Sequence, residues 1–317
     1  MDVLLVALGS TVGLRHAEDA LAASLERAGA SVAVARAAPQ PDVRTLAYTD
    51  WRWARAARAA ADEALREAQP RAILYYTTTA ALLWPRPGAI RFDSLAADSR
   101  PGRHGVWQRP LERRRLAQAP LVVPSAADVR FPTGVVVPPA VDVSGAGGKG
   151  SKDIAAITYA ANPEKKGLDR VLAAWAAARR EGEELVVAGT PGIDADGVRH
   201  VGSLPSAEYR ALLRRARVFV SAPRWEDFGI AQLEALADGC VLVAQHAPGP
   251  YVALPLARAL DARLVVRDAD GLARAIRTAL DDPAPSYAER AMPLVQPYST
   301  RAVDALVADR LLPALLG

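Results

Sequence analysis

The chain has 317 residues, 51% of them hydrophobic, and a net charge of +4, a length that favours about two domains with sizeable cores. No apolar run approaches the roughly 20 residues of a membrane span, and the first residues lack the basic start of a signal peptide. The single cysteine, Cys240, excludes an internal disulfide and predicts a reducing, cytoplasmic setting.

The first half of the chain alternates strands and helices. Strands are expected at 3–8, 32–35, 72–76 and 121–123, and helices at 14–28, 51–68 and 108–118. This alternation predicts parallel strands joined by right-handed crossovers. Gly9 and Gly13 lie in the loop after the first strand. They stand four residues apart, so the dinucleotide fingerprint Gly-x-Gly-x-x-Gly is absent.

The excess of basic residues lies in the first 144 residues, which contain 18 Arg against 14 Asp and Glu. Six arginines gather in one segment: Arg100, Arg103, Arg109, Arg113, Arg114 and Arg115. One interpretation is a solvated face, in a chain whose 35 arginines and four lysines indicate a GC-rich genome. The alternative is a surface for a phosphorylated acceptor or for anionic lipid headgroups. Nucleic-acid binding is not expected, because only Trp107 stands among the arginines.

Residues 144–151 read Ser-Gly-Ala-Gly-Gly-Lys-Gly-Ser. A Walker motif needs Gly-Lys followed by Ser or Thr, so this segment predicts a flexible interdomain linker instead. Alternation then resumes, with strands expected at 154–159, 185–188, 218–220, 241–244 and 264–266 and a last helix at 301–316. The four histidines lack the spacing of metal ligands, so no metal site is expected.

The most informative segment is the turn between the apolar run at 218–220 and a short helix that ends near Gly239. The amides of Phe228, Gly229 and Ile230 are expected to point outward at the positive end of this helix, which suits a diphosphate. Glu226 stands at the mouth of the turn, and Glu234 follows eight residues later. Both carboxylates can accept hydrogen bonds from sugar and ribose hydroxyls.

This Glu-x7-Glu pattern around Phe-Gly resembles the donor-site signature of retaining GT-B glycosyltransferases, particularly glycosyltransferase family 4. A second segment, Lys165-Lys166-Gly167 after the strand at 154–159, is similar to the Lys-Gly helix opening of the same family. The resemblance implies two Rossmann-like α/β domains facing a cleft. It implies an acceptor-side domain at 1–146, a nucleotide-sugar domain at 151–298, and a final helix at 299–317 that packs back on the first domain.

The resemblance also implies roles for single residues. Glu226 would hold the donor sugar and Glu234 the ribose. Lys166 would stabilise the charge that grows on the leaving diphosphate, with Lys165 as a substitute. The family arginine of this loop is replaced by Ala161, so Arg224 is expected to take over that phosphate contact.

Two candidates lie in the first domain. The family places a histidine near the transferred sugar where this chain has Phe92-Asp93, so Asp93 is the candidate by position. The alternative is that Asp93 only caps the following turn. The loop with Gly9 and Gly13 is expected to face the same cleft.

The activity implied is transfer of a sugar from a nucleotide sugar to an unidentified acceptor, with retention and without a metal or other cofactor. If the arginine segment is a binding surface and not a solvated face, the acceptor would be anionic or lipid-linked, with peripheral membrane contact through residues 100–115. The alternatives are a nucleotide-sugar epimerase or phosphorylase of the same fold, or a catalytically silent nucleotide-sugar-binding protein.

Overall fold

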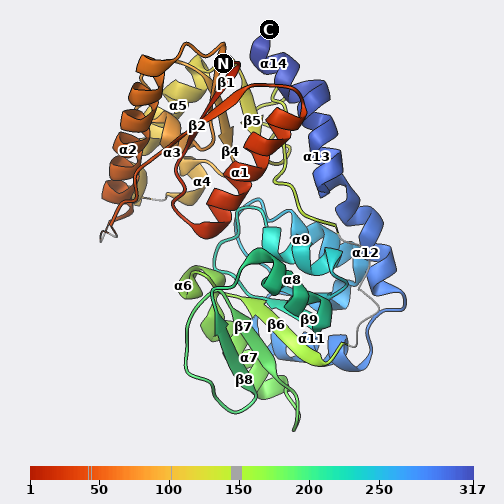
Figure 1. The fold of residues 1–317 in the computed structure, drawn as a ribbon. Coiled ribbons are helices and arrows are strands. Elements are labelled where there is room, and N and C mark those ends of the chain that lie inside the picture. Colours follow the sequence, from red (N-terminus) through yellow and green to blue (C-terminus); the bar gives the residue numbers. More distant parts are fainter. Residues whose placement is uncertain (42, 44, 101, 144–151) are drawn as a thin grey trace. The chain divides into compact units, whose positions relative to one another are not determined.

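The chain folds as two compact α/β units, drawn as a ribbon in Figure 1. A computed structural model describes residues 1–41, 43, 45–100, 102–143 and 152–317. Unit 1 comprises Met1–Ala140 and Thr300–Gly317, and unit 2 comprises Val141–Ser299. The predicted linker at 144–151 lies outside the described residues. The expected roles of the two parts, acceptor side to residue 146 and donor side from 151, stay a prediction.

Unit 1 is built on a five-stranded parallel sheet in the order β2-β1-β3-β4-β5. Its strands are β1 Val3–Ala7, β2 Val32–Arg36, β3 Ala72–Tyr75, β4 Ala89–Phe92 and β5 Val122–Pro124. Val3 of β1 stands opposite Val32 on one side and Ala72 on the other. The strand order therefore reverses between β1 and β3, and open α/β sheets bind ligands at the carboxyl ends of strands beside such a reversal.

Helices cover both faces of this sheet (Figure 1). They are α1 Val12–Arg27, α2 Leu46–Glu67, α3 Thr78–Ala81, α4 Ala96–Ser99, α5 Gln108–Gln118, α13 Thr300–Leu306 and α14 Leu312–Leu316. Leu4 and Val6 of β1 share one core with Ala57 and Ala61 of α2. Leu5 points to the opposite face, into a core shared with α1 and the C-terminal helices. Because both faces are buried, the strands read as continuous apolar runs.

The last helix departs from the prediction of one uninterrupted helix at 301–316. A π-helical turn, Val307–Leu311, separates α13 from α14. Pro313 has no N–H to donate to the preceding turn, which accounts for the altered hydrogen bonding here. On α13, Asp304 Oδ1 accepts hydrogen bonds from Arg27 Nη2 and Ser24 Oγ of α1 at 2.7 and 2.6 Å. These bonds join the C-terminal segment to unit 1.

Unit 2 is built on a six-stranded parallel sheet in the order β11-β10-β9-β6-β7-β8. Its strands are β6 Ile154–Tyr159, β7 Leu185–Ala188, β8 Val198–Gly202, β9 Ala216–Ser221, β10 Val241–Gln245 and β11 Val265–Val266. Its helices are α6 Pro163–Lys166, α7 Leu168–Ala178, α8 Ser206–Arg215, α9 Ile230–Ala237, α10 Ala253–Leu260, α11 Ala269–Asp281 and α12 Tyr287–Val295. The order reverses between β6 and β9, so the loops after these two strands meet at the expected ligand-binding position.

One strand of unit 2 was absent from the prediction. β8 lies at the edge of the sheet, and all five of its residues are half-buried. Arg199 and His200 interrupt its apolar character. An edge strand of this kind has no continuous hydrophobic run to reveal it.

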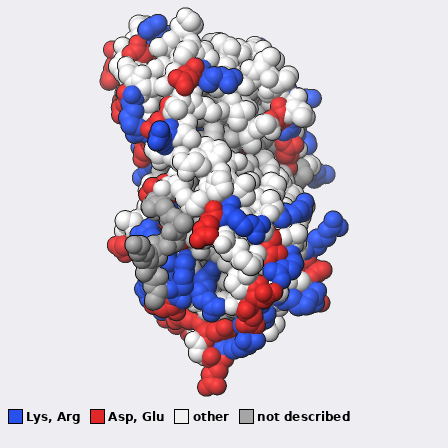
Figure 2. All heavy atoms as spheres, turned by 90° about the vertical axis from the view of Figure 1, so that its right-hand side faces the viewer, with Lys and Arg blue, Asp and Glu red and all other residues white. Residues whose placement is uncertain are grey.

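Exposed charges of both signs lie next to one another in the lower part of the face that Figure 2 shows. Ion pairs between arginine and aspartate involve many of the charges of unit 2. Arg215 Nη2 lies 2.6 Å from Asp153 Oδ2, and Arg180 Nη2 lies 2.8 Å from Asp281 Oδ2. Exposed pairs of this kind contribute little to stability. The fold therefore depends mainly on the two apolar cores of unit 1 and on the buried strands of unit 2.

Candidate functional site

The turn between β9 and α9 carries the main group of candidate residues. Gly229, the residue before α9, has φ +96°, and a Cβ there would lie 3.1 Å from Ala253 Cβ. Glycine therefore suits this position both by backbone conformation and by space. The amides of Phe228, Gly229 and Ile230 donate to no group in the part of the chain that the structure describes. They stand at the positive end of α9, an arrangement that favours an anion.

Glu226 is held in the mouth of this turn and is only 4% exposed. Its Oε2 accepts a hydrogen bond from Lys166 Nζ at 2.7 Å, and its own amide donates to Pro248 O at 3.1 Å. Lys166 ends α6, which follows β6. The two loops beside the strand-order reversal thus bring together a carboxylate and an ammonium that lie 60 residues apart in sequence.

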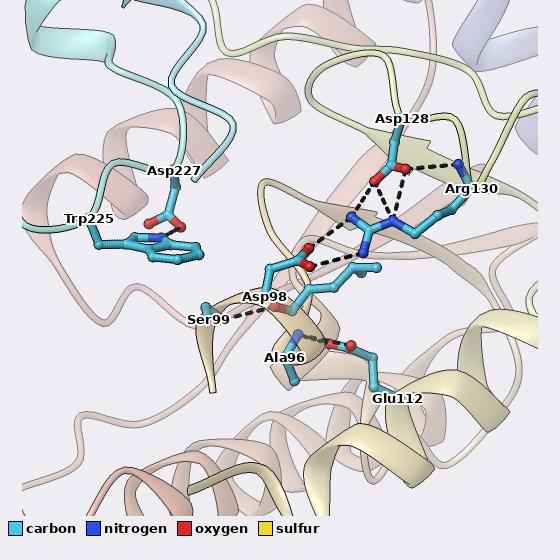
Figure 3. A network of polar contacts seen from close by, with 9 residues as sticks. Ala96, Asp98, Ser99, Glu112, Asp128, Arg130, Trp225 and Asp227 are labelled. Atoms are coloured by element: carbon cyan, nitrogen blue, oxygen red, sulfur yellow. Dashed lines mark hydrogen bonds and ion pairs between the residues drawn. The ribbon is translucent and has the colours of Figure 1, made fainter. Parts of the chain in front are cut away.

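The second lysine is paired as well. Lys165 Nζ lies 2.6 Å from Asp227 Oδ2, and Trp225 Nε1 donates to Asp227 Oδ1 at 2.7 Å. Figure 3 shows Trp225 and Asp227 joined in this way. The Lys165 side chain is 39% exposed, against 21% for Lys166. Lys166 is therefore the more desolvated of the two ammonium groups.

Arg224 points to a different partner from the one expected. Its guanidinium makes two hydrogen bonds to Asp169, at 2.9 and 2.7 Å, and a third to Glu164 O at 2.8 Å. Its backbone amide donates to Lys165 O at 2.8 Å. Arg224 therefore joins the loop after β9 to the loop after β6. The phosphate contact predicted for it stays a prediction.

Glu234 lies on α9, half-buried and without a hydrogen bond to its carboxyl group among the described residues. Burial raises the pKa of this carboxyl to about 7, although Arg210 acts in the opposite direction. Arg210 is itself committed to Asp238, with Nη2 and Oδ1 3.0 Å apart. A carboxyl group in this state changes charge near neutral pH and has acceptor capacity to spare.

Three residues around Glu226 were not singled out from the sequence. Gln232 Nε2 donates to Glu226 Oε2 at 3.0 Å and to Ser221 Oγ at 2.8 Å. Ser221 Oγ lies 3.1 Å from the hydroxyl of Tyr251. The sequence signal was a glutamine in a short helix whose other residues, apart from Glu234, are apolar, and polar residues that are buried need partners.

The candidates in unit 1 are Gly9, Gly13 and Asp93, and each has different surroundings. The amide of Gly9 donates to both carboxylate oxygens of Glu18, at 3.2 and 3.0 Å, whereas Gly13 is an exposed residue of α1. Asp93, just after β4, lies 3.0 Å from Arg91 Nη2. Arg91 is 1% exposed and stacks 4.2 Å from the centre of the Tyr76 ring. Asp93 thus has a buried cationic partner, and its role at the sugar stays a prediction.

Other polar contacts of unit 1 serve the fold. Figure 3 shows Arg130 between Asp98 and Asp128, with N–O distances of 2.8 and 2.6 Å, and Glu112 accepting a hydrogen bond from the amide of Ala96. These contacts hold the start of α4 and the loop after β5. Across the described ranges, no three His, Cys, Asp or Glu side chains are grouped so that they could hold a metal ion.

Gly167 offers a test of how closely the loop after β6 must approach the loop after β9. It has φ +64°, and a Cβ there would lie 2.0 Å from Ala222 O. Gly167→Ala should therefore lower the free energy of unfolding by about 2–5 kcal/mol, from the left-handed backbone and the overlap together. The matched control is Gly182→Ala, since Gly182 has φ +80° and open space around it. Urea unfolding of both variants measures the difference, and equal losses would contradict a close approach at Gly167.

Comparisons with known proteins agree with this geometry. Residues 152–282 match the family described as Glycosyl transferases group 1. A glycogen synthase of Mycobacterium tuberculosis is 41% identical over 86 residues, which are 27% of this chain and 20% of that protein. The chain thus aligns with about one fifth of the length of that curated relative.

The fold is similar to that of several solved structures over nearly the whole length of both chains. WaaG, a glycosyltransferase involved in lipopolysaccharide biosynthesis, superposes with a TM-score of 0.70 at 14% identity, covering 100% of both chains. Sucrose-phosphate synthase from Thermosynechococcus elongatus gives 0.73 at 16% identity over 99% of both chains. HepE of Anabaena, solved with UDP and glucose, gives 0.68 at 15% identity over 98% of this chain and 99% of that one.

These findings confirm the predicted family and the predicted fold class of two parallel α/β sheets. Residues 152–282 thus match the glycosyl transferases of group 1, and the two units have the GT-B fold.

Proposed function

We propose that the chain transfers a sugar from a nucleotide-sugar donor to an acceptor, with retention of configuration and without a metal. The observation that carries this proposal is the position of Lys166, Glu226 and three amides that donate to no described residue, all beside the strand-order reversal of unit 2. An ammonium and outward amides favour a diphosphate, and a buried carboxylate favours hydroxyl donors. A nucleoside diphosphate sugar carries both kinds of group.

In this proposal the anomeric C–O bond to the diphosphate breaks while the acceptor oxygen forms a bond on the same face of the sugar. The acceptor proton passes to the leaving diphosphate oxygen, so no nucleophile from the chain is required. Lys166 and the amides of Phe228, Gly229 and Ile230 stabilise the charge that grows on the diphosphate. Glu226 accepts from the sugar hydroxyls through Oε1, which has no hydrogen bond among the described residues.

The remaining candidates complete the donor and acceptor sides. Glu234 accepts from the ribose hydroxyls, Lys165 substitutes for Lys166, and Arg224 contacts the phosphates once it leaves Asp169. Asp93 contacts the transferred sugar, and Gly9 and Gly13 lie beside it, although Gly13 belongs to the first turn of α1 and not to the predicted loop.

The test is incubation of the purified chain with UDP-, GDP- and ADP-sugars, each with and without EDTA. UDP-sugars come first, because HepE was solved with UDP. Slow hydrolysis of one donor that EDTA does not affect, abolished in Glu226→Gln, supports the proposal. An epimerised donor or a sugar phosphate made with inorganic phosphate would indicate the epimerase or the phosphorylase. Binding without any turnover, even with a broad set of acceptors, would indicate a silent binding protein.

For the acceptor side we propose contact with an anionic or lipid-linked acceptor at one surface of unit 1. Of the arginines between 100 and 115, several serve the fold: Arg100 pairs with Asp50, Arg109 donates to Gly102 O, and Arg115 donates to Leu82 O. Arg113 and Arg114 are exposed and form no ion pair with any described residue.

Apolar side chains are exposed in the same region. Tyr48 and Trp51 at the start of α2 are 49% and 37% exposed, and Val106 is 62% exposed. Trp107 Nε1 donates to Ala47 O at 3.2 Å, which joins the loop before α5 to the start of α2. Tyr48, Trp51 and Trp107 line a pocket of about 380 Å³. Arg52 and Arg55 lie 5.9 and 4.8 Å from the centres of the Tyr48 and Trp51 rings, and aromatic rings beside arginines suit the interface of an anionic membrane. None of the described helices is long and apolar enough to cross a bilayer.

Charge screening tests this contact. The double variant Arg113→Gln, Arg114→Gln should bind vesicles containing anionic lipid less tightly at low salt, and its acceptor KM should depend less on salt. Donor affinity should stay unchanged. Arg301→Gln, Arg310→Gln is the matched control, because both arginines are exposed in the same unit. If the unaltered chain fails to co-sediment with such vesicles at low salt, the arginines are only a solvated face.

A further inference from the structure

Gln232 is a buried amide directed at the proposed sugar-binding carboxylate. It lies on α9, is 2% exposed, and donates through Nε2 to Glu226 Oε2 at 3.0 Å. A carboxylate can only accept hydrogen bonds, so the atom that faces Glu226 must be the amide nitrogen. The same nitrogen donates to Ser221 Oγ at 2.8 Å.

The hydrogen bonds continue behind Gln232. Ser221 Oγ lies 3.1 Å from the hydroxyl of Tyr251, which is 1% exposed. Burial raises the pKa of the Tyr251 phenol, so this group is neutral and can donate. Tyr251 also has φ +37°, a conformation that only a well-packed site imposes on such a residue. Ser221 and Tyr251 therefore hold the side-chain amide of Gln232 in one orientation.

The other end of the Gln232 amide has no partner. Its Oε1 is buried, accepts no hydrogen bond from any described residue, and lies 3.5 Å from the position that a Cβ on Gly229 would take. Packing alone would be served better by methionine or leucine, which leave no acceptor unused. The geometry thus accounts for a glutamine here through the bonds that its Nε2 donates to Glu226 and to Ser221.

We propose that Gln232 is a positioning residue that sets the orientation of the Glu226 carboxylate. Gln232 and Lys166 both donate to Oε2, the lysine at 2.7 Å, and Oε1 is left for the donor sugar. This inference rests on the proposed function. It goes further by separating the sugar contact from the diphosphate contacts, because the hydrogen bonds of Gln232 within the described residues go to Glu226 and Ser221 and not to Lys165 or the amides at the start of α9.

The first experiment compares Gln232→Met with Gln245→Met in the full chain, using the nucleotide sugar that the unaltered chain hydrolyses. Gln245 is the matched control, a buried glutamine of unit 2 whose Nε2 donates to Arg267 O and whose Oε1 also lacks a donor. Gln232→Met should lower kcat/KM for the nucleotide sugar about 10- to 100-fold, as expected for loss of a hydrogen bond to a charged group. Affinity for the matching nucleoside diphosphate should change less than about twofold, because no diphosphate contact is lost.

The second variant, Gln232→Glu, tests the pH profile of activity, which a change in packing alone would not alter. A protonated Glu at position 232 can still donate to Glu226, whereas two ionised carboxylates at this distance repel each other. Activity of Gln232→Glu should therefore be highest at low pH and fall as pH rises, relative to the unaltered chain. Gln232→Met should instead keep the pH profile of the unaltered chain at a lower level.

Three results would overturn the inference. Gln232→Met could match Gln245→Met in kcat/KM, or lose nucleoside diphosphate affinity as much as nucleotide-sugar affinity. Gln232→Glu could follow the pH profile of the unaltered chain. In these cases the proposed function stands, since the unaltered chain still hydrolyses its donor. If the unaltered chain neither binds nor hydrolyses any nucleotide sugar, the proposed function falls and the role of Gln232 falls with it.

Discussion

Lys166→Ala should lower kcat for the nucleotide sugar by roughly 10²–10³-fold, the range found when one donor to a developing anion is removed. KM should change much less, because the diphosphate becomes more negative only as the sugar leaves. Lys166 is the better placed of the two lysines, because the side chain of its partner Glu226 is only 5% exposed. The side chain of Asp227, the partner of Lys165, is 28% exposed. Charge interactions weaken as solvent approaches. Steady-state kinetics with the donor identified in the panel measures the effect.

Lys165→Ala is the control for this prediction. It removes the same charge from the neighbouring residue and takes one partner from Asp227 instead of one from Glu226. Its loss of kcat should be at least tenfold smaller than that of Lys166→Ala, in keeping with a more solvated pair. Equal losses in the two variants would mean that the lysines share the task, or that Lys165 is the residue that meets the phosphates.

The ion pairs at the turn have a further consequence for donor binding. Both lysines are already neutralised by carboxylates of the loop after β9. An incoming diphosphate therefore adds negative charge to a site that is nearly balanced, and the free amides of α9 must compensate part of it. The pairs also hold the lysine side chains in place before the donor arrives. A preorganised ammonium stabilises developing charge without reorganisation during the reaction.

Buried apolar strands and glycine-marked turns made much of this fold predictable. β6, β7 and the turn at Gly229 follow from apolar runs and from one glycine, which are local signals. The start of α2 at Leu46 instead of residue 51 and the edge strand β8 were missed. Both segments are partly exposed and mix polar with apolar residues, so periodicity carries little information there.

The candidate site was predictable only in part, for a related reason. Sequence placed Glu226, Glu234 and Lys166 by a family pattern, and a pattern of this kind says nothing of partners. The bond from Arg224 to Asp169 joins segments 55 residues apart, whose approach depends on the packing of the whole sheet. The bond from Gln232 to Glu226 spans only six residues, but it depends on the conformation of the turn at Gly229. The structural use of Arg115, which donates to Leu82 O and stacks on Trp84, also depends on tertiary packing. No local signal distinguishes it from Arg113 and Arg114.

Nucleotide affinity should rise with pH between about 6 and 8, because Glu234 ionises in this range in the free protein. Burial raises the pKa of its carboxyl from 4.5 to about 7. Ribose hydroxyls donate to a carboxylate better than to a neutral carboxyl, so binding should favour the ionised form and release a proton. Calorimetric titration in buffers of different ionisation enthalpy measures both the affinity and the proton release.

Two substitutions of Glu234 separate its charge from its shape. Glu234→Ala should weaken nucleotide binding by about 1–3 kcal/mol, the usual result when buried hydroxyls lose their acceptor. Glu234→Gln keeps an acceptor oxygen and should lose less affinity, but its affinity should no longer depend on pH across this range. An unaltered chain whose nucleotide affinity is constant from pH 6 to 8 would rule out the ribose contact.

The Glu234 carboxyl should also change how the free energy of unfolding depends on pH. This measurement checks the pKa of Glu234 without any ligand. A raised pKa means that the folded chain binds more protons than the unfolded chain between about pH 4.5 and 7. The contribution of Glu234 to stability therefore falls as pH rises through this window and is least favourable above pH 7. Glu234→Gln removes this titration. The free energy of unfolding of the variant, relative to that of the unaltered chain, should therefore increase as pH rises. If the difference between the two proteins is the same at pH 5 and pH 8, Glu234 ionises normally in the free protein. The rise of nucleotide affinity with pH would then need another group as its cause.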